Sequence, residues 1–167
     1  MGRVVRSAGG ADTLLWDSEL TGSETIVATV QQAANDAQID VASLRAVGIS
    51  APGPIDVFEG VITDPPNLPG WHNVPLARIL HQRLGVPTIL ENDANCQGVA
   101  EHQFGAGRGY RHMLFITIST GIGGGIIIDG RLFHGASDCA GEIGHITIDT
   151  SGRRCKCGNY GCLEAYA

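Results

Sequence analysis

One histidine and three cysteines near the end of the sequence have the residue types and spacing of a metal site. The histidine closes the run A-G-E-I-G-H, and the cysteines lie in the run C-K-C-G-N-Y-G-C. Thiolate and imidazole are the donors that Zn²⁺ prefers, and it binds them in tetrahedral sets of four. Glycines between the cysteines would let the backbone turn tightly enough to bring the sulfurs to one centre. The predicted ligands are His145, Cys155, Cys157 and Cys162.

The alternative interpretation of these cysteines is a disulfide or a set of unrelated thiols. Cys155 and Cys157 are too close in sequence to bridge each other comfortably. The opening residues do not resemble a signal peptide, so we expect a reducing cytoplasm, where disulfides are rare. The pattern therefore favours structural zinc.

Asp93 is the candidate for proton transfer. It follows the apolar run V-P-T-I-L at 86–90 and precedes an expected helix from Ala94 to about Phe104. Open α/β sheets place their ligands at the carboxyl ends of strands, where a carboxylate can act as a general base. The alternative role for Asp93 is that of a helix N-cap. Asn92 beside it could bind a polyol hydroxyl.

A glycine-rich run, S-T-G-I-G-G-G at 119–125, could bind an anion. Successive glycines let backbone N–H groups converge on a phosphate, and a threonine adds a hydroxyl. The segment that follows has the pattern of a strand rather than a helix, so the dinucleotide fingerprint is a poor match. An ordinary tight β-turn is the alternative. The candidate phosphate contacts are Ser119, Thr120, Gly121 and Gly123.

Alternating strand and helix patterns predict an α/β fold with a mixed sheet. The expected strands cover 44–50, 86–90 and 112–118, and the expected hairpins cover 55–63 and 126–133. A capping-box spacing at 21–24 predicts a helix start, and Asn73 and Gly85 are expected to begin and end a second helix. The polar, flexible run G-A-G-R-G at 105–109 is the expected boundary between an N-terminal lobe, 1–108, and the start of a second lobe, 109–167.

Composition excludes several classes of protein. The 167 residues carry a net charge of −6, which argues against a nucleic-acid surface. No run of eighteen apolar residues is present, so no membrane partner is expected. A hydrophobic content of 43% suffices for a globular core.

Six motifs in order make the sequence resemble the ROK family (repressors, open-reading-frame proteins and sugar kinases), and within it the bacterial glucokinases. The resemblance runs from about Val47 to Ala167. Its carriers are A-P-G-P at 51–54, P-N-L-P-G-W at 66–71, E-N-D-A-N at 91–95, S-T-G-I-G-G-G at 119–125, A-G-E-I-G-H at 140–145 and C-K-C-G-N-Y-G-C-L-E at 155–164.

The resemblance implies an actin-like (ribonuclease-H-like) two-lobed fold, with ATP-dependent phosphorylation of a hexose, most simply glucose, and Mg·ATP as the donor. It implies that Asp93 is the catalytic base and that the glycine run is the second phosphate loop. It also implies a homodimer when the protein is complete. The implied sugar contacts are Asn67, Asn92, Asp93, Glu142, His145 and Glu164. His145 serves twice, because one ring nitrogen can hold zinc while the other faces a hydroxyl.

Some features depart from the family pattern. The first phosphate loop, D-x-G-G-T, is not found, and the sequence stops directly after the cysteine motif. Ser119 and Asp138 stand where the family usually has glycine. We therefore expect residues 1–167 to be a partial protein that does not phosphorylate glucose on its own. The alternatives are the effector part of a sugar-responsive repressor and a non-catalytic sugar-binding protein.

Overall fold

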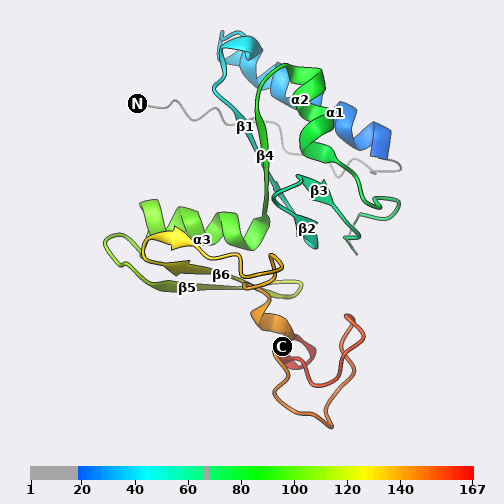
Figure 1. Cartoon of the computed structure of the whole chain (residues 1–167), viewed down its shortest axis with the longest axis vertical. Coiled ribbons are helices and arrows are strands. Elements are labelled where there is room, and N and C mark those ends of the chain that lie inside the picture. The colour runs from blue at the N-terminus through cyan, green and yellow to red at the C-terminus, as the bar shows by residue number, and fades with distance from the viewer. Residues whose placement is uncertain (1–18, 66–67) are drawn as a thin grey trace. The chain divides into compact units, whose positions relative to one another are not determined.

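The computed structural model describes residues 19–65 and 68–167, and it divides the chain into two compact units, Met1–Asn92 and Asp93–Ala167. Each unit combines helices with a small sheet, as the α/β prediction requires (Figure 1). The sheets are of both kinds, because the first unit pairs two strands in parallel and the second pairs its strands antiparallel. Within the described ranges, no helix is long and apolar enough to cross a membrane.

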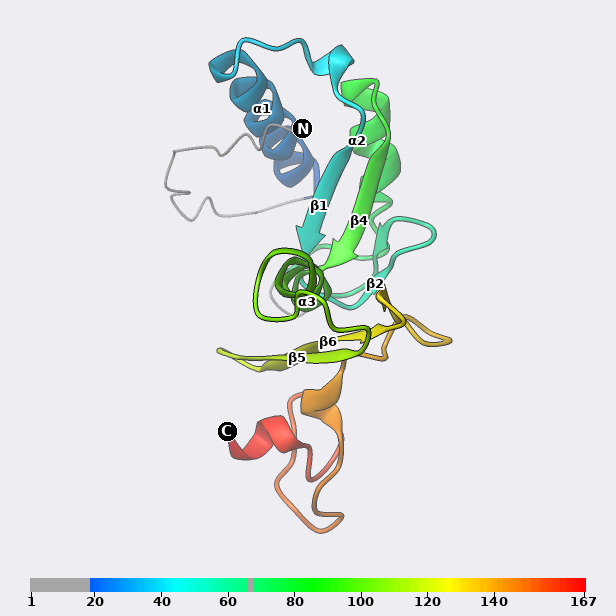
Figure 2. The same cartoon turned by 90° about the vertical axis from the view of Figure 1, so that its left-hand side faces the viewer.

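The first unit is built on two parallel strands, which lie side by side in Figure 2. They are β1 (Val47–Ala51) and β4 (Thr88–Asn92). A small antiparallel hairpin of β2 (Ile55–Asp56) and β3 (Val61–Ile62) separates them in sequence. The helices of this unit are α1 (Glu19–Asp36), the 3-10 turn η1 (Val41–Ser43) and α2 (Leu76–Leu84).

The core of this unit forms where α2 packs on the sheet. Leu76, Leu80 and Leu84 lie one helical turn apart and are all buried, together with Trp71 and Leu90. Ile26, Val27 and Val30 of α1 are partly buried and pack against this cluster. Gly85 ends α2 in a left-handed conformation, with φ 72°, and its N–H donates to the His81 carbonyl oxygen; this confirms the predicted helix end.

We expect Gly60→Ala to destabilise the first unit by roughly 1–3 kcal/mol, because overpacking and backbone strain add together. Gly60 has φ +66°, and an added Cβ would lie 2.3 Å from the Cβ of Ala77. The matched control is Gly48→Ala in β1, where nothing lies within 4 Å and the backbone is ordinary. Chemical denaturation of both variants checks this; equal unfolding midpoints would contradict it.

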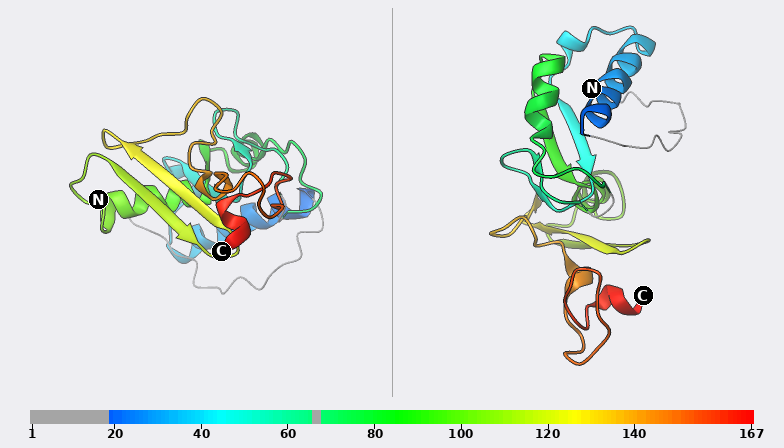
Figure 3. Two further views of the ribbon diagram at one scale, coloured as in Figure 1. Left: turned by 90° about the horizontal axis from the view of Figure 1, so that it is seen from below. Right: turned by 90° about the vertical axis from the view of Figure 1, so that its right-hand side faces the viewer.

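The second unit is an antiparallel sheet with a helix on one face and a loop on the other (Figures 1 and 2). Its order is β5–β6–β7, formed by Met113–Ile118, Ile122–Ile128 and Arg131–Leu132. The helix is α3 (Asp93–Phe104). The loop contains the 3-10 turns η2 (Ile143–His145) and η3 (Leu163–Tyr166), and Figure 3 shows the β5–β6 pair from below.

Two local predictions differ from the structure. The first helix begins at Glu19, before the predicted capping box, so Thr21 is inside the helix and cannot cap it. Asn73 does not cap α2: it is left-handed, with φ 51°, and Pro75 occupies the cap position without a side-chain bond. Short polar residues favour both caps and left-handed turns, so the sequence alone does not separate the two.

The division into units also falls elsewhere than the expected boundary at 108/109. The helix α3 belongs to the second unit because it lies directly on the glycines of β6: a Cβ on Gly98 would approach the Cα of Gly125 to 3.3 Å. The flexible run at 105–109 is therefore a connection inside this unit, from α3 to β5.

Candidate functional site

The four predicted metal ligands converge in the second unit. The donor atoms of His145, Cys155, Cys157 and Cys162 all lie within 4.8 Å of one another. The Sγ of Cys155 is 3.7 Å from the Nδ1 of His145, and the sulfurs of Cys157 and Cys162 are also 3.7 Å apart. Tetrahedral Zn²⁺ with bonds of about 2.3 Å to sulfur places its ligand atoms roughly 3.8 Å from one another. The arrangement therefore fits a four-coordinate ion.

The backbone of the loop is folded for this convergence. Gly158 and Gly161 have φ values of +94° and +69°, which side chains other than hydrogen rarely allow. A Cβ on Gly161 would lie 1.6 Å from the Asp149 carbonyl oxygen. The Cys155 N–H donates to the Asn159 carbonyl oxygen at 2.8 Å and closes the turn. The tight glycine turns expected from the sequence are present.

The thiols of the cluster differ in their ease of ionisation. Burial raises the pKa of Cys162 to about 12, so this thiol keeps its proton at neutral pH until a metal displaces it. Cys157 is exposed, and a hydrogen bond with the Asn159 backbone lowers the pKa of its thiol. All five cysteines of the chain are free thiols, so the disulfide alternative finds no support here.

The two ring nitrogens of His145 lie beside different groups. Its Nδ1 is turned to the cysteine cluster, and its Nε2 lies 3.9 Å from the Oε2 of Glu142. A carboxylate on the far nitrogen of a ligating histidine fixes its tautomer and raises its basicity as a ligand. Glu142 is exposed, and at 3.9 Å its carboxylate lies near this ring but beyond direct hydrogen-bonding distance.

Asp93 is the first residue of α3 and is exposed. Its Oδ1 accepts a hydrogen bond from the Ala94 N–H at 2.8 Å. An N-cap carboxylate bonds two or three residues ahead, so this short bond to the next residue is not the usual cap geometry. The carboxylate keeps acceptor capacity for another donor.

The glycine run lies between two neighbours on opposite faces of β6. A Cβ on Gly123 would meet the Cβ of Ala94 in α3 at 3.0 Å, and one on Gly124 would meet Ile143 in η2 at 2.8 Å. Only glycine lets both neighbours approach so closely. Gly123 is thus part of a strand, and the turn itself is limited to residues 119–121.

The exposed tip of that turn carries Ser119 and Thr120, and the Ser119 N–H donates to the Gly121 carbonyl oxygen at 2.9 Å. Glu164 belongs to the loop at 141–164 that carries the four candidate ligands, which we call the metal loop. Its Oε2 accepts from the Ile122 N–H at 2.8 Å. The structure therefore brings two predicted groups together, the glycine turn and one of the carboxylates.

Three further residues were singled out in the sequence: Asn92, Asn67 and Asp138. Asn92 is the last residue of β4, half-buried, and its N–H donates to the Glu91 carboxylate at 2.9 Å. Asn67 lies outside the described residues. Asp138, at a usual glycine position, does adopt the left-handed conformation, with φ 57°, which Asp tolerates better than most residues.

Sequence reasoning missed Asn95. This polar side chain is 5% exposed, and its Oδ1 lies 3.3 Å from the place where a Cβ on Gly141 would stand. It therefore packs α3 against the segment that leads into Glu142. The signal was present in the second asparagine of the E-N-D-A-N motif, because a polar residue on the buried side of a helix needs a reason.

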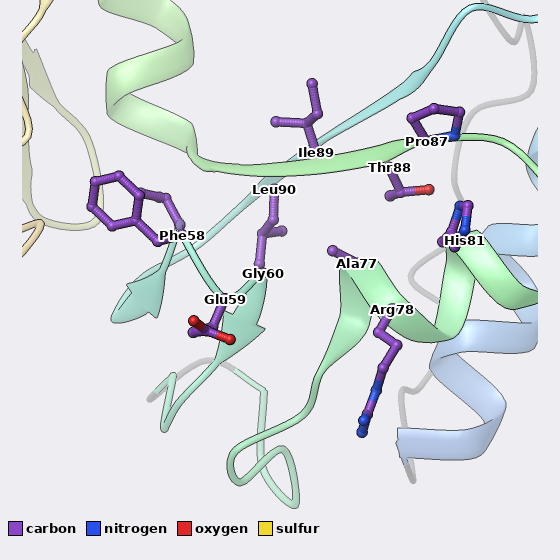
Figure 4. Close-up of a pocket in the computed structure, with 11 residues that line it drawn as sticks. Phe58, Glu59, Gly60, Ala77, Arg78, His81, Pro87, Thr88, Ile89 and Leu90 are labelled. Atoms are coloured by element: carbon purple, nitrogen blue, oxygen red, sulfur yellow. The ribbon is translucent and has the colours of Figure 1, made fainter.

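The first unit has a separate groove of about 470 Å³ beside β4 (Figure 4). It runs between the β2–β3 turn and α2, and Phe58, Leu90 and Arg78 are among its lining residues. The Nδ1 of His81 lies 2.8 Å from the Val86 carbonyl oxygen, within hydrogen-bonding distance, which fixes that ring at the edge of the groove. Among the residues that the structure describes, none of those predicted to bind sugar, phosphate or metal lines it.

The fold and the site together define an α/β protein with a carboxylate at a helix start, a glycine turn and a Cys₃His loop. The chain matches the model of the ROK family over residues 16–167 and belongs to that family. It carries part of the actin-like, ribonuclease-H-like fold of these proteins.

Three relatives illustrate the match. The glucokinase of Thermotoga maritima is 47% identical over 121 residues, which are 72% of this chain and 38% of that protein. The xylose repressor of Bacillus spizizenii is 40% identical over 124 residues, 74% of this chain and 32% of the repressor. The crystal structure of a ROK glucokinase from Streptomyces griseus, in complex with glucose and AMPPNP, superimposes with a TM-score of 0.75 at 39% identity. That match covers 90% of this chain and 46% of the glucokinase, so the chain spans less than half the length of these relatives.

Proposed function

We propose that the protein to which this chain belongs phosphorylates a hexose with ATP, and that Asp93 is the general base. Asp93 would take the proton from the sugar hydroxyl as that oxygen attacks the γ-phosphate, releasing ADP. The observation that carries the proposal is the placement of Asp93. Its carboxylate is exposed at the start of α3, and the next residue of that helix packs on the glycine strand.

The sugar contacts that we propose in the second unit can accept hydrogen bonds from sugar hydroxyls. Glu142 is exposed, and the Nε2 of His145 faces it rather than the metal cluster. Glu164 is half-buried and can accept from more than one donor. The family resemblance adds Asn92, which directly precedes Asp93, and Asn67.

Phosphoryl transfer is mostly positioning and stabilisation of charge, and we assign part of this to the glycine turn. Ser119 and Thr120 are exposed at its tip, where a hydroxyl and backbone N–H groups can meet a phosphate. Mg²⁺ would bridge the phosphates of ATP. The glucokinase bound to glucose and AMPPNP supports a nucleotide as donor.

We assign the Cys₃His cluster to structural zinc. Its four donors fit tetrahedral coordination, so no coordination position on the ion remains open for a substrate. Free thiols gathered in this way are in keeping with a reducing cytoplasm. The complete protein is proposed to be a homodimer, on the family resemblance alone.

A sugar-responsive repressor is the second candidate, and the similarity to a xylose repressor favours it. The two functions differ in one result. Measurement of ADP formation by the natural protein with ATP and glucose, mannose or xylose should give sugar-dependent turnover if it is a kinase. Sugar binding seen by calorimetry without ADP formation, together with sugar-sensitive DNA binding, would overturn the kinase proposal.

A further inference from the structure

The metal loop touches the start of β6 at two points. The carbonyl oxygen of Ile122 lies 2.2 Å from the place where a Cβ on Gly144 would stand, so η2 packs directly on it. The N–H of the same residue donates to the Oε2 of Glu164 in η3. Both backbone groups of Ile122 are thus covered by the loop that carries the four metal ligands.

The direction of the Ile122 N–H explains why Glu164 is needed. In the β5–β6 hairpin, the Ser119 N–H donates to the Gly121 carbonyl oxygen. Antiparallel ladders alternate between bonded and non-bonded pairs, so the next pair, Ile118 and Ile122, points its N–H groups away from the partner strand. Because Ile122 is buried, its N–H needs an acceptor outside the hairpin, and Glu164 supplies it.

Glu164 is held in place by the cluster itself. It is two residues after Cys162, which is buried and is the N-cap of η3. The adjacent Leu163 N–H donates to the Ile146 carbonyl oxygen at 3.0 Å, and Thr147 pairs with Cys162. Gly121 also packs closely against the Glu164 carboxylate, since a Cβ on Gly121 would lie 2.4 Å from the Glu164 Oε2.

We infer that Glu164 is a positioning residue through which the metal loop fixes the glycine turn at residues 119–121. The inference rests on the proposed metal site, and it assigns that site a task beyond holding its own loop together. The carboxylate bond is charge-assisted and therefore stronger than a bond to a neutral acceptor. Loss of the metal would free Glu164 and, with it, the start of β6.

Hydrogen exchange of the Ile122 amide, followed by NMR in the zinc-loaded protein, tests this without any activity assay. Glu164→Ala should raise the exchange rate about tenfold or more, and Glu164→Gln, whose amide oxygen still accepts, should raise it less. Asp149→Asn is the matched control in the same loop, because the Asp149 Oδ1 accepts from the Ser151 N–H within its own turn, and it should leave the Ile122 rate within twofold. The amides of Ile127 and Ile128, at the far end of β6, give the internal reference.

Removing zinc with a chelator completes the test as a double-mutant cycle. In the wild type, metal loss should speed exchange at Ile122 about tenfold, while in Glu164→Ala it should add less than twofold. An unchanged Ile122 rate in Glu164→Ala, or an equal chelator effect in both proteins, would overturn the inference. Because exchange is read on the protein alone, these outcomes do not depend on whether it proves to be a kinase.

Discussion

Cys157→Ser should release the metal: the wild-type protein, purified without added metal, is expected to contain one zinc per chain and the variant almost none. A serine hydroxyl does not lose its proton to zinc as a cysteine thiol does, so one of four ligands is lost. Changes in residues that only touch a ligand typically weaken binding 10- to 100-fold, so loss of a ligand should exceed about 100-fold. Metal analysis after gel filtration measures this directly.

The same variant should loosen the whole loop, because few buried side chains hold it. From Ile146 to Ala167, only Cys155, Gly161 and Cys162 are buried. Exposed hydrogen bonds also link parts of the loop. The Tyr166 hydroxyl, for example, accepts from the Arg153 N–H at 3.1 Å and lies 3.4 Å from the Asp149 carboxylate. Metal-binding free energy in such loops is folding free energy, so hydrogen exchange across 146–167 should rise when zinc is lost.

Cys139→Ser is the control for both effects. Cys139 is exposed and lies outside the cluster, and its Sγ donates to the Ser137 carbonyl oxygen within its own turn. This variant should keep its zinc and its exchange pattern. A stable protein without metal, with an ordered loop and a wild-type exchange pattern, would refute the zinc assignment.

The sequence predicted best those features that depend on local rules. The strands β1 and β4, the end of α2 at Gly85 and the hairpin over 126–133 follow from apolar runs and turn residues. It failed where one residue type suits two conformations: Asn73 has the chemistry of a cap and the backbone of a turn. The glycines of β6 were also hard to interpret from the sequence. They are needed because α3 and η2, which lie elsewhere in the sequence, pack closely against this strand.

For the site, the residue types indicated which residues belong to it but not which of them contact one another. The four candidate metal ligands were singled out because thiolates and imidazole at that spacing have few other uses, and the structure brings their donor atoms within 4.8 Å of one another. The bond from Ile122 to Glu164 joins residues 42 positions apart through a backbone N–H, which every residue possesses, so no pattern of side chains could reveal it. Asn95 was missed because burial, rather than residue type, makes it significant.

Asp93→Asn is expected to lower turnover by about two to four orders of magnitude, the usual contribution of a general base. The substitution is nearly isosteric, and the amide oxygen can still accept from the Ala94 N–H, so the start of α3 should be preserved. What the amide cannot do is take a proton. We therefore expect the affinity for sugar, measured by calorimetry on the natural protein, to change far less than turnover with ATP and glucose.

The comparison with Asp93→Ala separates catalysis from local structure. Alanine removes both the base and the acceptor of the Ala94 N–H, whereas asparagine removes only the base. If Asp93 is the base, both variants should be slow to a similar degree, and only the alanine variant should show faster amide exchange in the first turn of α3. If the carboxylate merely supports that helix, Asp93→Asn should retain near-normal turnover and only Asp93→Ala should lose it; that result would remove Asp93 from the mechanism.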